Sequence, residues 1–329
     1  MDQPRLQPEK PLVHIVASCT QRKGYPVPAD LRLGSISHGK LAERLATWSD
    51  RLQQNGVNRI AAVNLYRGQH WAVVRELPAV AQASGFRANL WVTSAGYGLV
   101  PAEAQVRPYS ATFAASEEDS VWRPSDGDRP TTLRTWWKGL QGLPGSVAGA
   151  PRSLTSLAGI SPDAVLLVIA SPSYVAAMAD DLTGARAKLA DPQHLIVISS
   201  RNGSLPECLA SHLVPSEAPL SGVLGGARGS LHARTARRIL QEAATVPLYA
   251  NILVPRYARL VSEVESATTP VRLKLTDDDV RKFILEAITK NGDLACTAAL
   301  RRLRSSGQAC EQRRFTGLYA EVTRTANVA

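Results

Sequence analysis

Five short runs of apolar residues constrain the fold of this chain more than any other feature. The runs are residues 12–17, 59–63, 88–93, 164–170 and 194–199. Near-continuous runs of Val, Ile and Leu are typical of parallel strands, whose sheet is covered by helices on both faces. The stretches at 40–55, 71–84 and 172–190 carry apolar residues at helical spacing. Alternating strands and helices therefore predict an α/β fold with a mostly parallel sheet flanked by helices.

The length of 329 residues favours two domains over one. We expect an α/β domain over residues 1–255 and a helical nucleic-acid-binding module over residues 256–329. A stretch rich in glycine, proline and serine, 114–163, interrupts the first domain, and its tryptophan-bearing part at 122–137 is a candidate lid. In the module, Thr276 precedes three aspartates as a helix N-cap, and three short helices predict a helix-turn-helix-like unit.

The composition excludes several classes of protein. No apolar run approaches the roughly 18–20 residues that cross a bilayer, and the polar N-terminus lacks the apolar core of a signal peptide. The four cysteines form no Cys-x-x-Cys pair and the six histidines show no ligand spacing, so we expect reduced thiols, no metal and a cytoplasmic location. A Gly-Lys-Ser/Thr phosphate loop is absent, and no cofactor is predicted.

The formal net charge of +10 has two readings. It suits a polyanionic partner such as nucleic acid, and it also suits a surface that only keeps the protein soluble. Basic residues gather in the C-terminal module, where a single face could bind DNA or could simply be solvated. The candidates for phosphate contacts or, at Gln312 and Arg313, for reading base edges are Arg301, Arg302, Arg304, Gln312, Arg313 and Arg314.

Ligands of open parallel sheets bind beyond the carboxyl ends of the strands. The loops predicted there are rich in hydroxyls, tyrosines and basic side chains, a set that suits a planar base with a nearby phosphate. The alternative is that serine and glycine at strand ends are ordinary turn residues. Predicted base-binding residues are Ser18, Cys19, Tyr25, Tyr97, Tyr109, Ser171 and Asn202, and predicted phosphate-binding residues are Arg22, Lys23, Arg201 and Arg228.

Excision of a base passes through an oxocarbenium-like sugar, which requires an activated water and a group that stabilises the departing base. Glu103 is the carboxylate placed closest to the predicted crevice by the sequence, and it is the candidate for orienting water. It could equally be a surface acid that faces solvent. Arg67 and His70 are the candidates for stabilising the departing base.

Four sequence blocks, in order, resemble a bacterial family of unknown function that is related to the YaaA-like peroxide-stress proteins. The blocks are residues 16–23, 65–68, 93–101 and 107–112. Gly96 stands where the family usually has lysine, and Ser110 where an aspartate commonly follows Pro-Tyr. The resemblance extends more distantly to the deazaguanine-modification domain of archaeosine synthase. It implies an α/β fold similar to that of uracil-DNA glycosylases.

A weaker resemblance, to bacteriophage-replication-inhibiting DNA glycosylases, implies excision of a hypermodified base from phage DNA. The working hypothesis is a DNA glycosylase of anti-phage defence that flips a modified base, such as glucosylated hydroxymethylcytosine, out of double-stranded DNA. Two alternatives remain open. One is a non-catalytic DNA-binding stress protein, and the other is a base-exchanging transferase of the deazaguanine type.

Overall fold

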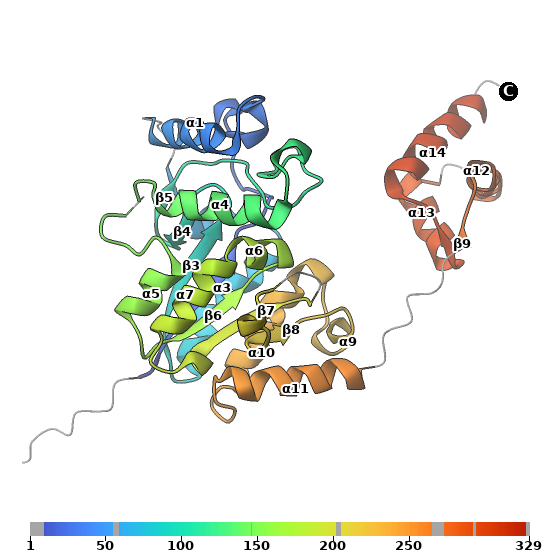
Figure 1. Ribbon diagram of the computed structural model, residues 1–329. Coiled ribbons are helices and arrows are strands. Elements are labelled where there is room, and N and C mark those ends of the chain that lie inside the picture. Colours follow the sequence, from blue (N-terminus) through green and yellow to red (C-terminus); the bar gives the residue numbers. More distant parts are fainter. Residues whose placement is uncertain are drawn as a thin grey trace, which may run out of the picture. The chain divides into compact units, whose positions relative to one another are not determined.

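The computed structural model describes residues 10–54, 59–145, 147–201, 205–264, 273–291 and 294–326. The chain divides into two compact units, Met1–Val264 and Glu265–Ala329, and each is described by itself (Figure 1). The boundary predicted at residue 255 falls inside helix α11 (Ala250–Glu263). This helix packs against β8, the last strand of the sheet, and therefore belongs wholly to the first unit.

A six-stranded sheet forms the centre of the first unit, in the order β4-β3-β1-β6-β7-β8. All neighbouring strands are parallel except β3 and β4, where Trp91 pairs with Pro101. The predicted fold class, a mostly parallel sheet flanked by helices, is confirmed. The strands are β1 (Leu12–Ser18), β3 (Arg87–Ser94), β4 (Gly98–Pro101), β6 (Val165–Ile169), β7 (Leu195–Ser199) and β8 (Leu213–Pro215).

The strand order reverses between β1 and β6. From β1 the chain goes to β3 on one side, and after β4 it crosses to β6 on the other side. Loops leave the two neighbouring carboxyl ends in opposite directions at such a point, which opens a crevice there. The topology therefore predicts a ligand site at the residues that follow Ser18 and Ile169.

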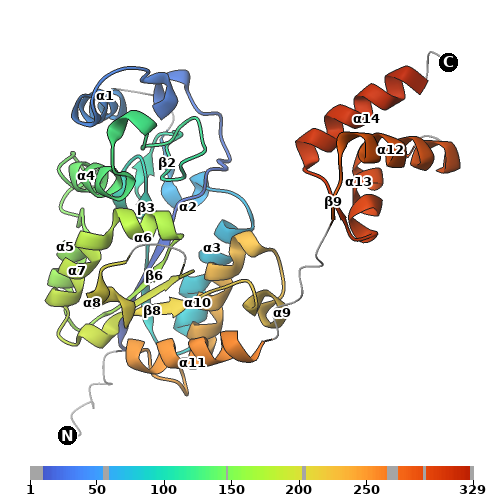
Figure 2. The same cartoon turned by 45° about the vertical axis from the view of Figure 1, so that its right-hand side comes forward.

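Helices cover both faces of this sheet (Figure 2). Helices α3 (Gln69–Ala83) and α10 (Leu231–Glu242) pack against each other and against β1, β3, β6 and β7. The other face carries α4 (Arg129–Gln141), α5 (Leu154–Ile160), α6 (Pro172–Ala177) and α7 (Ala179–Lys188). The remaining helices of the unit are α1 (Leu41–Gln53), α2 (Ala62–Leu65), α8 (Glu207–Ala210) and α9 (Leu220–Leu224), with short 3-10 turns at Ala29–Leu31, Leu33–Ser35, Pro124–Asp126, Pro192–His194 and Arg228–Ser230.

One predicted strand is wrong, and two strands of the central sheet, β4 and β8, were missed. Residues 59–63 do not join the central sheet: β2 (Ile60–Ala61) pairs antiparallel with β5 (Gln105–Val106), and the chain then turns into α2. Two consecutive alanines favour a helix over a strand, and Ala62 of this run is buried as the first residue of α2. Strand β8 spans only three residues, which is too short for periodicity to reveal.

The tryptophans of the insertion belong to the core. Trp136 and Trp137 on α4 are almost fully buried. The Trp136 indole donates to the carbonyl of Ala95 at 2.8 Å, and the Trp137 indole donates to the Asp181 carboxylate at 3.0 Å. Because both rings are fixed by packing and by hydrogen bonds, the predicted lid at residues 122–137 is wrong for this pair.

In the second unit three helices surround one apolar cluster that includes Val280, Leu303 and Phe315. They are α12 (Asp277–Asn291), α13 (Cys296–Ser305) and α14 (Gln312–Ala326), with a parallel pair of two-residue strands, β9 (Leu273–Lys274) and β10 (Gln308–Ala309). Thr276 caps α12 as predicted: its hydroxyl accepts from the Asp279 amide, and the Asp279 carboxylate accepts from the Thr276 amide. The helix-turn-helix-like arrangement stays a prediction.

Candidate active site

The loops after β1 and after α2 lie side by side. The Gly24 amide donates to the Leu65 carbonyl at 2.8 Å, and the Arg67 amide donates to the Arg22 carbonyl at 3.0 Å. The Thr20 hydroxyl adds a bond to the Arg67 carbonyl at 2.9 Å. These contacts form a short two-stranded ribbon that projects from the carboxyl end of β1.

Cys19 directly follows β1 and lies between β3 and α6. Its amide donates to the carbonyl of Thr93 on β3, and its sulfur lies 3.1 Å from the hydroxyl of Tyr174 on α6. Cys19 and Cys310 are buried, Cys296 is half-buried and Cys208 is exposed, all as free thiols. Cys19 thus contacts β3 through its backbone amide and α6 through its small, buried side chain.

A buried tyrosine cluster lies beneath the ribbon. The Tyr109 hydroxyl lies 2.6 Å from the Ser94 hydroxyl and 3.0 Å from the Tyr66 hydroxyl. Burial raises the pKa of Tyr66, Tyr109 and Tyr174 well above the usual phenol value, so all three are neutral. Tyr109 has no exposed surface, and it cannot stack on a ligand as predicted. The residues around Tyr109 in the sequence do not distinguish a buried tyrosine from an exposed one.

The ammonium group of Lys23 lies above this cluster. Its Nζ is 4.9 Å from the centre of the Tyr109 ring and 5.3 Å from that of Tyr66, within the range of cation–π attraction. It also donates to the carbonyls of Thr20 at 2.5 Å and Gln21 at 3.3 Å. Burial lowers the pKa of Lys23, and the nearby Cys19 and Asp119 oppose that shift. Lys23 is therefore a half-buried ammonium that is partly removed from solvent.

Lys23 lines a polar cavity of about 440 Å³, which we call the Lys23 cavity. This volume is within the usual range for a small-molecule site. Tyr25 is 42% exposed at its wall, and the Arg67 guanidinium lies 6.0 Å from the Tyr25 ring centre. The lining residues are Gln21, Lys23, Tyr25, Pro26, Val27, Arg32, Ser110, Glu117, Glu118 and Asp119.

Asp119 is the buried acid of this cavity, with only 8% of its surface exposed. One carboxylate oxygen accepts from the Gly34 amide at 2.8 Å, and the other lies 3.9 Å from the Arg32 guanidinium. Sequence reasoning missed Asp119 because it lies in the irregular insertion. The only signal was the run Glu117-Glu118-Asp119, which any solvated loop could carry.

Glu103 does not lie at this edge of the sheet. Strand β4 runs antiparallel to β3, so the chain travels back from Gly98, opposite Ser94, to Pro101, opposite Trp91. The Ala102 amide then bonds to the Leu90 carbonyl, four residues before the end of β3. At about 3.3 Å per residue, Glu103 lies on the order of 10 Å from the carboxyl edge. The exposed Glu103 is therefore a surface acid, and its predicted role in orienting water is wrong.

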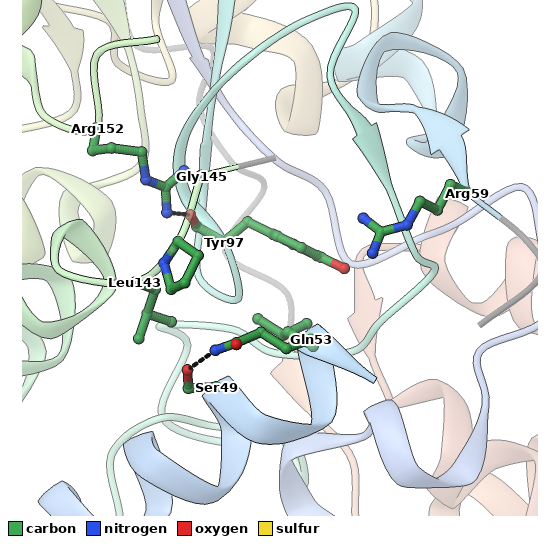
Figure 3. Close-up of a pocket in the computed structure, with 9 residues that line it drawn as sticks. Ser49, Gln53, Arg59, Tyr97, Leu143, Gly145 and Arg152 are labelled. Carbon is green, nitrogen blue, oxygen red and sulfur yellow. Dashed lines mark hydrogen bonds between the residues drawn. The ribbon is translucent and has the colours of Figure 1, made fainter. Parts of the chain in front are cut away.

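Tyr97 lines a second, smaller cavity of about 250 Å³ (Figure 3). Its ring extends toward Arg59, and its hydroxyl accepts from the Arg107 amide at 3.0 Å. Burial raises the pKa of Tyr97 to about 12. The Arg152 guanidinium is committed to the carbonyls of Tyr97, Leu99 and Leu140. Because Arg152 serves the backbone, Arg59 is the remaining cation among the described residues that line this cavity, and no acid is among them, whereas the Lys23 cavity has three.

His70 and His232 begin α3 and α10, the two helices that pack on one face of the sheet. Burial lowers the pKa of each to about 4, with a further lowering of the His70 pKa by His232 and a hydrogen bond to the Ser18 backbone in the opposite direction. Both rings are neutral near pH 7. A neutral His70 ring is unable to stabilise a departing base by positive charge. The predicted role is therefore wrong for His70 as a cation.

The other predicted residues of the first unit are spread along the same edge. Ser18 is buried at the end of β1, and Ser171 precedes α6 with its hydroxyl 3.3 Å from that of Ser173. Arg22 and Arg228 are exposed, and Arg201 lies 3.9 Å from Glu217. Asn202 lies outside the described residues. Arg67 donates to the carbonyls of Asn64 and Tyr66, so its guanidinium partly braces the ribbon.

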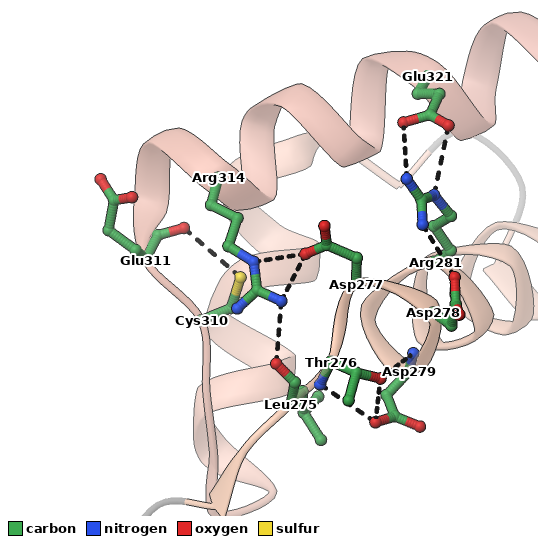
Figure 4. Close-up of polar contacts among 10 residues, drawn as sticks. All are labelled: Leu275, Thr276, Asp277, Asp278, Asp279, Arg281, Cys310, Glu311, Arg314 and Glu321. Atoms are coloured by element: carbon green, nitrogen blue, oxygen red, sulfur yellow. Dashed lines mark hydrogen bonds and ion pairs between the residues drawn. The ribbon is translucent and has the colours of Figure 1, made fainter.

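In the second unit the predicted DNA-binding residues divide into two groups, of which the first includes Arg314, drawn in Figure 4. Arg314 pairs with Asp277 at 2.5 Å and donates to the Leu275 carbonyl, which joins α14 to the start of α12. Arg304 donates to the carbonyl of Cys310. These two guanidiniums are partly used within the fold. The exposed members, free of such roles among the described contacts, are Arg301, Arg302, Gln312 and Arg313.

Within the described ranges, no group of three or more His, Cys, Asp or Glu side chains is arranged to hold a metal ion. No helix in that part of the chain has both the length and the apolar character needed to cross a membrane. The sequence matches no protein-family model, no curated protein and no solved structure. The function is therefore inferred from the chemistry of the Lys23 cavity.

Proposed function

We propose that this protein is a DNA glycosylase that hydrolyses the N-glycosidic bond of a modified nucleotide flipped into the Lys23 cavity. The observation that carries the proposal is that a half-buried amine, Lys23, and a buried carboxylate, Asp119, line one nucleotide-sized cavity. The cavity is lined in part by the loop that follows β1, one of the two strands between which the strand order reverses, and ligand sites of open α/β sheets lie at such loops. Its polar lining suits a decorated base more than an apolar molecule.

The residues support a division of roles in hydrolysis. Tyr25 is the exposed ring that stacks on the extruded base. Asp119 orients and deprotonates the water that attacks the anomeric carbon, because its carboxylate is held by the Gly34 amide. The ammonium of Lys23 donates a proton to the departing base, a transfer that its lowered pKa facilitates. Glu103 and Tyr109 have no part in this scheme.

The second unit supports DNA as the substrate class. Arg301, Arg302 and Arg313 are exposed on α13 and α14, where they are able to neutralise phosphates. Flipping a base costs a few kcal/mol of unstacking, which contacts to the phosphate backbone help to offset. Double-stranded DNA that carries a hypermodified base is therefore the proposed partner.

The test is incubation of the full chain with matched duplexes that contain cytosine, hydroxymethylcytosine or glucosylated hydroxymethylcytosine at one position. The expected result is alkali-sensitive abasic sites and a released free base from one modified duplex only. Absence of abasic sites and of free base on every duplex would remove the proposal.

The same reactions separate the alternatives. A transferase would insert a supplied free deazaguanine and leave no abasic site. A non-catalytic protein would retard the duplex on a gel and leave every base in place. Asp119→Asn serves as the inactive control, because asparagine keeps an acceptor for the Gly34 amide and loses the basic carboxylate.

A further inference from the structure

We propose that Lys23 also forms a covalent imine with the abasic sugar, so that the protein cleaves the DNA strand as a lyase after it has removed the base. This inference rests on the proposed function for its substrate, an abasic site in DNA. It depends on how the environment of Lys23 differs from that of an ordinary surface lysine.

Three features of that environment favour a nucleophilic amine. Lys23 lines the cavity, so a ligand in the cavity lies against it. Desolvation disfavours its charged form, which is the usual means of activating a lysine for attack on a carbonyl. Transfer of its proton to the departing base would leave the free amine beside the newly exposed sugar carbon.

The surroundings also suit the product of that attack. A protonated imine is a cation, and the faces of Tyr66 and Tyr109 lie 5.3 and 4.9 Å from the Lys23 nitrogen. These rings would stabilise the iminium by the same attraction that they exert on the ammonium. Asp119 in the same cavity supplies a base for the next proton transfer.

The reaction balances without any added oxidant or cofactor. The Lys23 amine attacks the C1′ aldehyde of the ring-opened sugar, and water leaves to give the imine. Asp119 removes a proton from C2′, the C3′–O bond breaks, and its electron pair leaves with the 3′-phosphate. Water then hydrolyses the imine, which releases an unsaturated aldehyde and regenerates the amine.

The experiment supplies the abasic site ready-made, so that it does not depend on base excision. The full chain is mixed with a duplex that carries one abasic site, and cyanoborohydride is added to reduce any iminium to a stable secondary amine. The expected result is a covalent protein–DNA species whose attachment is mapped to Lys23 by mass spectrometry of its peptides. Lys23→Arg should abolish it, and Lys138→Arg, a change on the exposed surface of α4, should leave it intact.

The outcomes distinguish failure of the lyase proposal from failure of the glycosylase proposal. No trapped species, or one mapped to another amine such as the N-terminus, would overturn the role of Lys23 even if bases are excised. A species mapped to Lys23 without excision of any base would support the lyase and count against the glycosylase. Mapping on the unaltered chain keeps the result decisive if Lys23→Arg fails to fold.

Discussion

Tyr25 and Tyr109 differ in what each is able to offer a ligand. Tyr25 is 42% exposed at the wall of the Lys23 cavity, and Tyr109 has no exposed surface and holds the hydroxyls of Ser94 and Tyr66. Stacking on a base requires a ring face that is exposed, as in Tyr25, whereas packing in the core requires a ring that is covered, as in Tyr109. The two residues should therefore respond to substitution in opposite ways.

Tyr25→Ala should weaken binding of the modified duplex by about 1–3 kcal/mol, the usual contribution of one base–aromatic stack. Its melting temperature should stay unchanged. Tyr109→Phe should lower the free energy of unfolding by about 1–3 kcal/mol, because it leaves buried hydroxyls without a partner. Titration of fluorescent DNA and urea unfolding measure the two effects. A loss of stability in the first variant, or of affinity alone in the second, would contradict this assignment.

Asp119→Asn should slow base release by about 10²- to 10⁴-fold, the usual contribution of a general base. The matched control is Glu118→Gln, which neutralises an exposed acid of the same cavity and should have a far smaller effect. Single-turnover excision kinetics give the comparison. Equal effects of the two substitutions would show that the cavity needs negative charge in general and not a carboxylate at position 119.

For single residues, the sequence predicted which side chains lie near the candidate site better than it predicted what each side chain does there. It placed Lys23 and Tyr25 in a loop at the carboxyl edge of the sheet, since a loop that follows a buried parallel strand begins at that edge. It misplaced Glu103, because the antiparallel return of β4 depends on pairing with β3 that no local pattern reveals. It missed Asp119 because burial of an acid in an irregular loop depends on Gly34 and Arg32, which are distant in sequence.

Among the elements, helices α3 and α10 each carry a half-buried histidine in the first turn. The pKa of His70 and of His232 is about 4 in the folded protein, below the ordinary value of 6.5. The unfolded chain therefore binds more protons than the folded one between pH 6.5 and pH 4. The stability contributed by these neutral histidines is complete above pH 6.5 and is lost as the pH falls toward 4.

Each such histidine should add about 1.4 kcal/mol per pH unit to the slope of unfolding free energy in that window. His232→Gln should flatten the slope measured between pH 6.5 and pH 4.5, and His38→Gln, at an exposed position, should not. Urea unfolding followed by tryptophan fluorescence is the suitable method, because all six tryptophans belong to the first unit. An unchanged slope in His232→Gln would mean that the ring is not buried in solution.

Local sequence patterns predicted several of the strands and helices correctly. Strands β1, β3, β6 and β7 were predicted within one or two residues, because each is a long apolar run with a clear end. The capped start of α12 was predicted because capping is a local interaction of Thr276 with Asp279. By contrast, β2 and β8 are defined by pairing with distant partners and carry too few residues to be read locally.

At the scale of the whole molecule, net charge alone does not locate the contact with DNA. The last 65 residues hold eleven basic and eight acidic side chains, a surplus of three out of the total of ten. Most of the surplus therefore belongs to the first unit. What distinguishes the second unit is which arginines remain exposed after the internal ion pairs have formed.

Arg313→Ala should weaken binding to any duplex and reduce the dependence of log K on log salt by about one, because one phosphate contact is lost. Arg314→Ala should instead destabilise the second unit, since it breaks the pair with Asp277. Filter binding at several salt concentrations and far-ultraviolet circular dichroism distinguish the two effects. If Arg313→Ala leaves the salt dependence unchanged, α14 does not contact the DNA backbone.

The distribution of thiols has a practical consequence. Cys208 is exposed on α8, which directly precedes β8 and so lies at the amino end of the sheet, away from the Lys23 cavity. Cys19 is covered by Tyr174. In a Cys296→Ser variant, which removes the half-buried thiol of the second unit, a maleimide dye should therefore attach to the first unit through Cys208. This label leaves the chemistry untouched and provides a reporter for rotational motion of that unit when DNA is added.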